Sequence, residues 1–404
     1  MHICLICDEL PPGPHGGVGS FTADLANGLA DAGNRVTVLV AEVDNRRHWS
    51  LDKARKPGIN SKVIGVHLSS PAWMRWRPGS LWQKWQLLQA LKAEHSKDPF
   101  DIVECMDNGG LLPFGAIKAV PCVVRLHGAS FFYDSKLRSN TTDSFTHWLE
   151  KQTLRQADHL VAVSNYVAKE ELAVAGSRRH SDCTIYNAVD TDFFSPDPSS
   201  PLEAGLIVFA NTIHPRKGIV ELCNAMNILG GSFPSARLLI LGKEIAVGTS
   251  GRALSAELMD EVKAEFRNRV IFAGMKQRPE VLAHLRRAHV CCYPSKLETF
   301  GIAPLEAMAV GKPTIFSHTG AGPEVIEDGV SGLLCNPDSP EDIARKISLI
   351  LSDDNLAVDL GKGARERAVS HFGLPGWIAR NLAFYNSVVS DQKPVKLGSN
   401  TPGL

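Results

Sequence analysis

Two glutamates with seven residues between them occur in the segment SKLETFGIAPLEAMAVGKP, residues 295–313. The pattern puts Glu298 in a loop after an expected strand and Glu306 one turn inside the following helix. A carboxylate in the loop can accept hydrogen bonds from one end of a ligand, and a carboxylate on the helix can bind a vicinal diol at the other end. A solvated helix start, which acidic side chains also favour, is the alternative. Because the flanking residues are apolar, we favour ligand binding.

The turn between the two glutamates suits an anionic ligand. Glycine permits a close approach of the backbone, and Pro304 near the helix start costs no hydrogen bond, because the first amides of a helix lack an intrahelical acceptor. The free amides around Phe300, Gly301 and Ile302 are therefore expected to form a site for a diphosphate.

A second candidate segment, FANTIHPRKGIVEL at residues 209–222, contains Arg216 and Lys217 between an expected strand and an expected helix. Two cations held beside a diphosphate can neutralise the charge that develops on a leaving nucleotide. A pair of solvated surface charges is the alternative. The segment alone does not decide between them.

Near the N-terminus, Gly16, Gly17 and Gly19 lie in a loop between the first expected strand and an amphipathic helix, and they leave no side chain to block a ligand. A dinucleotide-binding dehydrogenase is one alternative, since Glu42 can imitate the acidic residue that binds the ribose. This fingerprint fits poorly, because the strand ends about eight residues before the glycines and Thr22 stands where the third glycine belongs.

These segments lie in a chain of 404 residues, of which 44% are apolar and 21% charged, as is typical of globular proteins with two or three domains. Short β-branched runs alternate with longer amphipathic stretches, which predicts parallel sheets covered by helices. The expected strands cover residues 2–7, 35–40, 62–68, 101–105, 122–127, 159–164 and 183–189, followed by 206–211, 237–242, 269–274, 289–295, 313–318 and 332–336.

Prolines and serines gather in residues 191–205, which predicts a linker. We therefore expect two doubly wound, Rossmann-like α/β domains, residues 1–190 and 206–373, that face each other across a cleft. A helix over residues 374–390 is expected to complete the first domain, and residues 391–404 are expected to form a disordered tail. Because ligands bind at the carboxyl ends of parallel strands, the loops that follow strands should carry the chemistry.

The glutamate segment resembles the signature of the retaining glycosyltransferases of family four, also called glycosyltransferase group 1, which have the GT-B fold. The other segments occur in the order expected for that family over nearly the whole chain. The resemblance implies that Glu298 contacts hydroxyls of the donor sugar, that Glu306 binds the ribose diol and that the turn amides hold the diphosphate. It also implies that the first domain binds the acceptor and the second binds the sugar nucleotide.

The resemblance gives roles to the remaining candidates. Lys217 matches a diphosphate-binding lysine, and Gly16 and Gly17 match a loop that approaches the donor phosphates from the other side of the cleft. His127 ends the strand CVVRLH and precedes a glycine. A single histidine is usually structural, but the resemblance implies that His127 positions a sugar hydroxyl. The chain departs from the family pattern at residues 211–212, where the family often has an arginine, and at residues 243–244, where many relatives have a second glycine.

Charge is unevenly distributed along the chain. Lysines plus arginines equal aspartates plus glutamates, 43 each, so the total charge does not indicate a nucleic-acid partner. Residues 45–92, however, contain ten lysines and arginines against one acid, together with five of the seven tryptophans. We take Arg75, Trp76 and Arg77 as candidate acceptor-binding residues, in a stretch that suits a lipid-linked or anionic acceptor at a membrane surface. A basic loop followed by a helix that buries Trp82 and Trp85 in its own core is an equal alternative.

The expected function is the transfer of a sugar from a UDP- or GDP-sugar to an acceptor hydroxyl, with retention at the anomeric carbon, in polysaccharide or glycolipid biosynthesis. No metal and no cofactor are expected. A sugar-nucleotide 2-epimerase of related fold and a non-catalytic sugar-nucleotide-binding protein are the alternatives. The chain has no apolar run long enough to span a membrane, and its nine scattered cysteines are typical of reduced core residues. We expect a cytoplasmic protein that can associate with a membrane surface.

Overall fold

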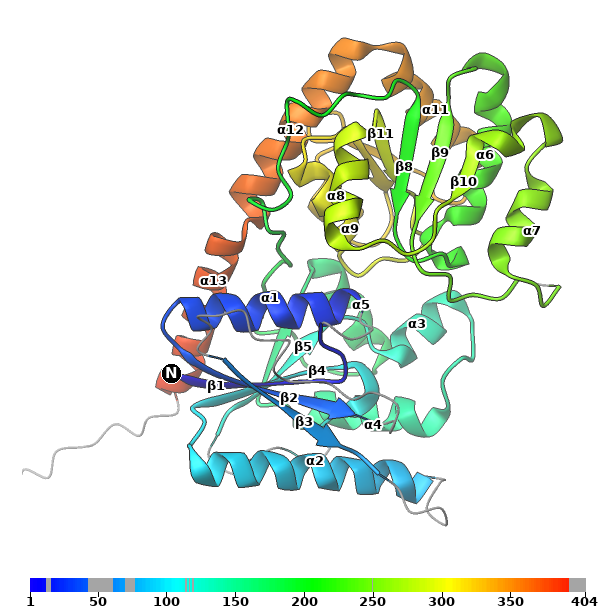
Figure 1. Ribbon diagram of the computed structural model, residues 1–404. Coiled ribbons are helices and arrows are strands. Elements are labelled where there is room, and N and C mark those ends of the chain that lie inside the picture. Colours follow the sequence, from blue (N-terminus) through cyan, green and yellow to red (C-terminus); the bar gives the residue numbers. More distant parts are fainter. Residues whose placement is uncertain are drawn as a thin grey trace, which may run out of the picture.

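The computed structural model describes residues 1–11, 16–42, 61–69, 77–112, 115, 117, 120–248 and 250–391. These residues form two α/β units, each built around a parallel sheet with helices on both faces (Figure 1). The predicted fold class is therefore correct.

The N-terminal sheet contains seven described strands, all paired in parallel. Every residue of β1, the third strand in spatial order, is buried, because this mostly apolar strand is covered on both faces. In spatial order the strands are β3 (Ser61–His67), β2 (Arg35–Glu42), β1 (His2–Cys7), β4 (Ile102–Met106), β5 (Cys122–Leu126), β6 (His159–Ala162) and β7 (Cys183–Thr184). The helices of this unit are α1 (Gly17–Asp31), α2 (Arg77–Lys97), α3 (Ser130–Leu137), α4 (Ser144–Gln156) and α5 (Asn165–Val174), with a short 3-10 turn, η3 (Asn108–Gly110).

The C-terminal sheet contains six described strands, again all parallel. In spatial order they are β10 (Val270–Phe272), β9 (Arg237–Leu241), β8 (Leu206–Ala210), β11 (Val290–Tyr293), β12 (Thr314–Ser317) and β13 (Leu333–Cys335). The helices are α6 (Ile219–Ser232), α7 (Leu254–Glu261), α8 (Arg278–Arg287), α9 (Ile302–Ala309), α10 (Gly322–Val325), α11 (Pro340–Ser352) and α12 (Asp354–Phe372), with 3-10 turns η4 (Pro215–Lys217) and η5 (Ala264–Arg269).

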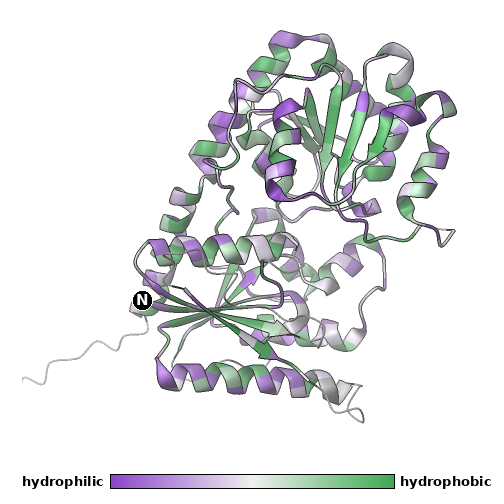
Figure 2. Ribbon diagram, in the orientation of Figure 1, coloured by the Kyte–Doolittle hydropathy of each residue, from purple (hydrophilic) through white to green (hydrophobic). Residues whose placement is uncertain are grey.

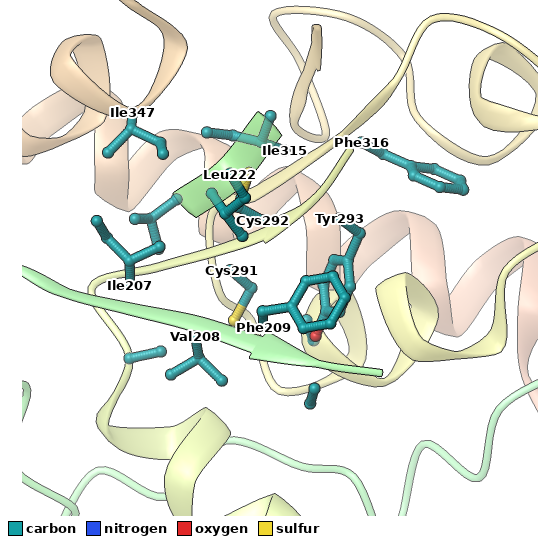
Figure 3. Close-up of a cluster of buried hydrophobic side chains, with 14 of the residues drawn as sticks. Ile207, Val208, Phe209, Leu222, Cys291, Cys292, Tyr293, Ile315, Phe316 and Ile347 are labelled. Carbon is teal, nitrogen blue, oxygen red and sulfur yellow. The ribbon is translucent and has the colours of Figure 1, made fainter. Parts of the chain in front are cut away.

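The core of the C-terminal unit lies between this sheet and its helices. Figure 2 shows apolar strands and helices with polar outer faces. In the centre of the core, Phe209 of β8 and Tyr293 of β11 lie with their ring centres 6.1 Å apart, and both are fully buried (Figure 3). These two strands are neighbours, and the loops that follow them carry the charged candidates Lys217 and Glu298.

In each sheet the order of strands reverses beside the first strand, between β1 and β4 and between β8 and β11. This reversal point is where doubly wound sheets bind ligands, since the following loops part there. Each strand range predicted from the sequence overlaps an observed strand. The largest difference is at residues 183–189, where β7 ends at Thr184 because the chain leaves the sheet and the Tyr186 ring stacks on Phe300 of the other unit.

The chain passes between the two units twice. Residues 191–205 form neither helix nor strand, although Phe194 is fully buried in the core of the C-terminal unit. Later, α12 leads into α13 (Leu374–Asp391), which returns to the N-terminal unit and packs against α1 (Figure 1). Trp377 and Tyr385 of α13 are buried in the same cluster as β1 and β2. The predicted tail lies outside the described residues from 392 onward.

A buried polar network also joins α13 to the N-terminal sheet. Arg125 of β5 donates to both oxygens of Glu104 on β4 and to the side chain of Asn381. The hydroxyl of Tyr385 donates to the same glutamate at 2.7 Å. None of the helices in the described part of the chain is long and apolar enough to cross a membrane.

Candidate active site

Lys217 and Glu298 form a buried ion pair at the carboxyl end of the C-terminal sheet. Lys217 ends the turn η4 after β8, and Glu298 lies in the loop after β11. The Lys217 ammonium donates a hydrogen bond to Oε2 of Glu298, and both residues are more than nine-tenths buried. The sequence alternatives of a solvated helix start and a solvated charge pair are therefore wrong for these two residues.

Glycine makes this pairing possible. Gly218 has φ +71°, and a Cβ at this position would lie 1.8 Å from the carbonyl oxygen of Pro294. The two loops can approach so closely only because residue 218 has no side chain. A backbone hydrogen bond from Lys296 to the Arg216 carbonyl, 2.9 Å long, also ties the loops together.

The charges around Glu298 keep it ionised. Burial alone would raise the pKa of Glu298, but the positive charges of Lys217 and Arg216 outweigh burial, so that its pKa is lowered. Burial lowers the pKa of Lys217, and the charge of Glu298 opposes that shift. The site therefore holds a carboxylate beside two cationic side chains.

Arg216 connects the ion pair to the N-terminal unit. Its guanidinium group lies over the ring of Tyr133 from α3, 4.6 Å from the ring centre, and its Nη1 donates to the carbonyl of Leu297 at 3.2 Å. A cation over an aromatic face is held by the charge distribution of the ring. Tyr133 was not predicted as a site residue, because a lone tyrosine in an expected helix carries no motif.

The N-terminus of α9 faces the glycine loop of the other unit. Gly301, the residue before the helix, has φ +99° and packs against Phe316. A Cβ on Gly17 would lie 3.8 Å from Cδ1 of Ile302, so the two segments are in near contact. The side chain of Phe300 is buried in the core, so this residue can offer a ligand only its backbone. The first amides of α9, which lack an intrahelical acceptor, thus begin beside Gly17.

The glycine loop itself is held by Glu9. The carboxylate of Glu9 accepts hydrogen bonds from the amides of Gly16 and Gly19, both at 2.9 Å, at the start of α1. This contact could not be predicted from the sequence, because Glu9 lies in a loop with no recognisable cap pattern.

Glu306 lies on α9 near the contact between the units. Burial raises the pKa of Glu306 to about 7, while the charge of Arg278 opposes this shift and that of Asp24 adds to it. Arg278 on α8 also approaches Asp24 on α1, with 4.0 Å between charged atoms. Neither Arg278 nor Asp24 was predicted to lie near the site, because they are on separate helices that only the tertiary fold brings together.

His127 follows β5 and is buried. Its ring packs edge-on against Phe21, with 4.5 Å between ring centres, and its Nε2 has no hydrogen-bond partner among the described residues. Burial, together with the charge of Arg125, lowers the pKa of His127 to about 3. The imidazole is therefore neutral at physiological pH and can exchange a hydrogen bond with a ligand hydroxyl.

Thr299, next to Glu298, lies in the contact between the units. Its carbonyl accepts a hydrogen bond from the hydroxyl of Ser164 at 2.7 Å, and its hydroxyl accepts one from Tyr133 at 3.4 Å. Gly128 has φ +100°, and a Cβ there would lie 2.6 Å from Cγ2 of Thr299. His127 adjoins Gly128 and Glu298 adjoins Thr299, so the Gly128–Thr299 contact brings the His127 loop and the Glu298 loop together.

Two other acids, in segments that follow strands, cap helices. Glu324, in the GAGPE segment, accepts hydrogen bonds from the amides of Asn165 and Tyr166 at 2.7 and 2.8 Å and so caps α5 across the interface. Glu244, within the departure from the family pattern at residues 243–244, caps α7 through the amide and hydroxyl of Ser255. This departure from the family pattern thus has a structural role.

The candidate acceptor residues cannot all be placed. Arg75 and Trp76 lie outside the described residues, and Arg77 is the first residue of α2. Further along α2, the rings of Trp82 and Trp85 stack at 4.7 Å, and Trp85 is 48% exposed. The interpretation that this helix buries both tryptophans in its own core is therefore wrong for Trp85.

Cys4 and Cys7 lie on β1, where both are buried and unpaired. Within the described ranges, no group of three or more histidine, cysteine, aspartate or glutamate residues is arranged to hold a metal ion. Gly16 and Gly17 lie at the start of α1, opposite the N-terminus of α9.

Two facing Rossmann-like units, with a buried lysine–glutamate pair and a helix N-terminus where they meet, form the architecture of the GT-B fold. The sequence matches the family model "Glycosyl transferases group 1" over residues 190–367 and "Glycosyltransferase Family 4" over residues 15–193. The chain belongs to the family-four, group 1 glycosyltransferases, which take their sugar from a nucleotide-sugar donor.

Individual relatives match this chain over most of its length. A glycogen synthase of Mycobacterium tuberculosis H37Rv is 26% identical over 397 residues, covering 92% of this chain and 91% of the relative. The structure of a sucrose-phosphate synthase from Thermosynechococcus elongatus superimposes with a TM-score of 0.79 at 22% identity, over 96% of this chain and 99% of the other. HepE from Anabaena, solved with UDP, gives 0.75 at 20% identity, over 96% and 100%. These structural likenesses establish the fold.

Proposed function

We propose that this protein transfers a hexose from a UDP- or GDP-sugar to an acceptor hydroxyl, with retention at the anomeric carbon and without a required metal ion. The observation that carries the proposal is the buried Lys217–Glu298 pair beside the N-terminus of α9, one residue from the contact with the His127 loop. This arrangement offers cations and amides for a diphosphate and polar groups for a sugar.

In the proposed reaction, the bond from the anomeric carbon to the diphosphate oxygen breaks and a bond from that carbon to the acceptor oxygen forms on the same face. The proton of the acceptor hydroxyl passes to the departing diphosphate oxygen. Arg216, Lys217 and the amides of Phe300, Gly301 and Ile302 stabilise the charge on the diphosphate. Gly16 and Gly17 let the other unit approach the phosphates without a side chain between.

The remaining site residues bind the sugar and the nucleoside. A diphosphate would share Lys217 with Glu298, and Glu298 would then accept hydrogen bonds from sugar hydroxyls. His127, being neutral, exchanges a hydrogen bond with another hydroxyl, and Glu306 binds the ribose diol. UDP is the first nucleotide to test, since the structural relative HepE was solved with UDP and with UDP-glucose.

The donor is identified by thermal-shift screening of UDP-, GDP- and ADP-sugars against the intact protein. NMR of the product with each stabilising donor then gives its anomeric configuration, and retention is expected. Formation of an epimerised sugar without an acceptor would favour the 2-epimerase, and binding without release of nucleotide would favour a binding protein. Lys362, an exposed lysine on α12, provides the matched control: Lys217→Ala should lose turnover and Lys362→Ala should keep it.

We further propose that the acceptor is carbohydrate or lipid-linked and is met at a membrane surface, as in polysaccharide or glycolipid biosynthesis. The stacked Trp82 and Trp85 on α2 support this proposal, because exposed tryptophans suit membrane interfaces and sugar rings. The fraction of protein that floats with anionic vesicles should be smaller for Trp85→Ala than for wild type. Trp148→Ala, which removes a 42% exposed tryptophan on α4, is the matched control. Absence of flotation at low salt would remove the membrane part of the proposal.

A further inference from the structure

The backbone from His127 to Phe131 leads from β5 into α3, and all five of its amides donate to buried carboxyl groups. The three acids come from three different elements: Asp107 follows β4, Glu150 lies on α4 and Glu171 lies on α5. These three carboxyl groups hold the loop of residues 127–131 from three different elements of the fold. The amides of His127 and Gly128 donate to Oδ2 of Asp107 at 2.8 and 2.9 Å. The amide of Ala129 donates to Oε1 of Glu171 at 3.3 Å. The amides of Ser130 and Phe131 donate to Oε1 and Oε2 of Glu150, both at 3.1 Å.

Asp107 and Glu171 also contact each other. Their carboxyl groups are within hydrogen-bonding contact, and the oxygens not used by the loop, Oδ1 of Asp107 and Oε2 of Glu171, have no other partner among the described residues. Ionised carboxylates only accept hydrogen bonds, so this buried contact is satisfied only when one hydrogen lies between the two groups. The oxygens that face the loop must both stay acceptors.

We propose that Asp107 and Glu171 share one proton and act together as positioning residues that aim His127 at the donor sugar. This inference rests on the proposed donor-binding role of His127. A second ionisation would set two carboxylates against each other, push the loop apart and displace His127 together with the Gly128–Thr299 contact. Because Thr299 adjoins Glu298, both sides of the donor site would be affected.

The electrostatic surroundings agree with one shared proton. Burial raises the pKa of Asp107 to about 6, and burial followed by the charge of Asp107 raises that of Glu171 well above its usual range. Other groups also face the pair: Glu150 from α4, Cys105 from β4, Tyr133 from α3, and His127 itself after β5. Lys84 from α2 acts on Glu150, and its Nζ donates to the carbonyl of Gly109.

Amide substitutions test the shared proton directly. In Asp107→Asn the new NH2 group replaces the proton by donating to Glu171, and in Glu171→Gln it donates to Asp107. Each single variant should therefore keep the donor KM within about twofold, whereas the double variant sets two NH2 groups against each other and should raise KM by about tenfold or more. A double variant whose effect is the sum of the single effects would overturn the proposal.

Glu150→Gln is the matched control, because both oxygens of Glu150 already accept from amides. A glutamine at position 150 must point its NH2 group at a backbone N–H, which leaves both groups without an acceptor. Glu150→Gln should therefore bind the sugar nucleotide more weakly, whereas Glu171→Gln should not. Equal loss in both variants would indicate packing rather than a shared proton, and would contradict the proposal.

The pH dependence gives a second readout that does not need a folded double variant. Above the pH range in which Glu306 ionises, the wild-type donor KM should rise with pH as the shared proton is lost. Glu171→Gln should remove this alkaline rise, since its amide does not titrate. An unchanged alkaline rise in Glu171→Gln would overturn the proposal.

Urea unfolding separates failure of this inference from failure of the proposed function. A carboxyl group whose pKa is raised by folding stabilises the folded state below its usual pKa and loses that contribution as pH rises through the raised value. Above about pH 4.5, the usual pKa of a glutamate, the stability of wild type should therefore fall relative to Glu171→Gln as pH increases. This result is expected whether or not a sugar is transferred, and parallel pH profiles would count against the shared proton.

Discussion

Lys217 and Glu298 are 81 residues apart in the chain, yet the ammonium group of one donates to the carboxylate of the other where both are nearly excluded from water. Removing one partner of such a pair leaves an uncompensated buried charge. Lys217→Ala should therefore lower the free energy of unfolding by about 3–5 kcal/mol.

The same change should reduce kcat by about a hundredfold or more, because the departing diphosphate loses a cation. Urea unfolding and initial rates at saturating donor measure the two effects. Lys362→Ala should change neither. Wild-type turnover in a folded Lys217→Ala protein would remove Lys217 from the catalytic assignment.

Gly218→Ala tests how closely the loops that carry Lys217 and Glu298 must approach each other. The added methyl group would collide with the Pro294 carbonyl and would also force a positive φ on alanine. Gly176→Ala isolates the second effect, since Gly176 has φ +66° and no atom within 4 Å of a Cβ. We expect Gly176→Ala to cost about 1 kcal/mol and Gly218→Ala to cost clearly more. Equal unfolding free energies for the two variants would show that the loops can move apart freely.

Donor binding should depend on the ionisation of Glu306. Its pKa is raised to about 7, so most of the carboxylate is protonated at pH 6 and loses acceptor strength toward a ribose diol. The donor KM should therefore be up to about tenfold higher at pH 6 than at pH 8. Glu306→Gln should bind the donor weakly at both values, with little change between them. A wild-type acid rise that persists unchanged in Glu306→Gln would point to another group.

Tyr133 should act through its ring rather than its hydroxyl. Tyr133→Phe keeps the face under Arg216 and removes only a long hydrogen bond to Thr299, so kcat/KM should change by about twofold or less. Tyr133→Leu removes the face and should lower kcat/KM by about three- to thirtyfold. Equal loss in the two variants would instead assign the effect to the hydroxyl.

Much of the fold was predictable, because buried parallel strands are continuous apolar runs and the helices between them are amphipathic. The Glu298 and Glu306 spacing, with Gly301 between, was also readable as a local pattern. The acids that hold the His127 loop were not. Asp107, Glu150 and Glu171 look like ordinary loop or helix acids, and only the packing of three elements brings them together. Arg278 and Asp24 escaped notice for the same reason.

The paired crossings of the chain limit how the enzyme can open. Where the first crossing begins, the amide of Val189 donates to the carbonyl of Phe372 at 2.9 Å, and Val189 pairs in parallel with Gly373 at the second. Because the two crossings are tied together, we expect the units to bend relative to each other about one axis more easily than they twist, since twisting would break the hydrogen bond between the crossings. The contacts of Gly17 with Ile302 and of Gly128 with Thr299 should then form in the same register each time the units close.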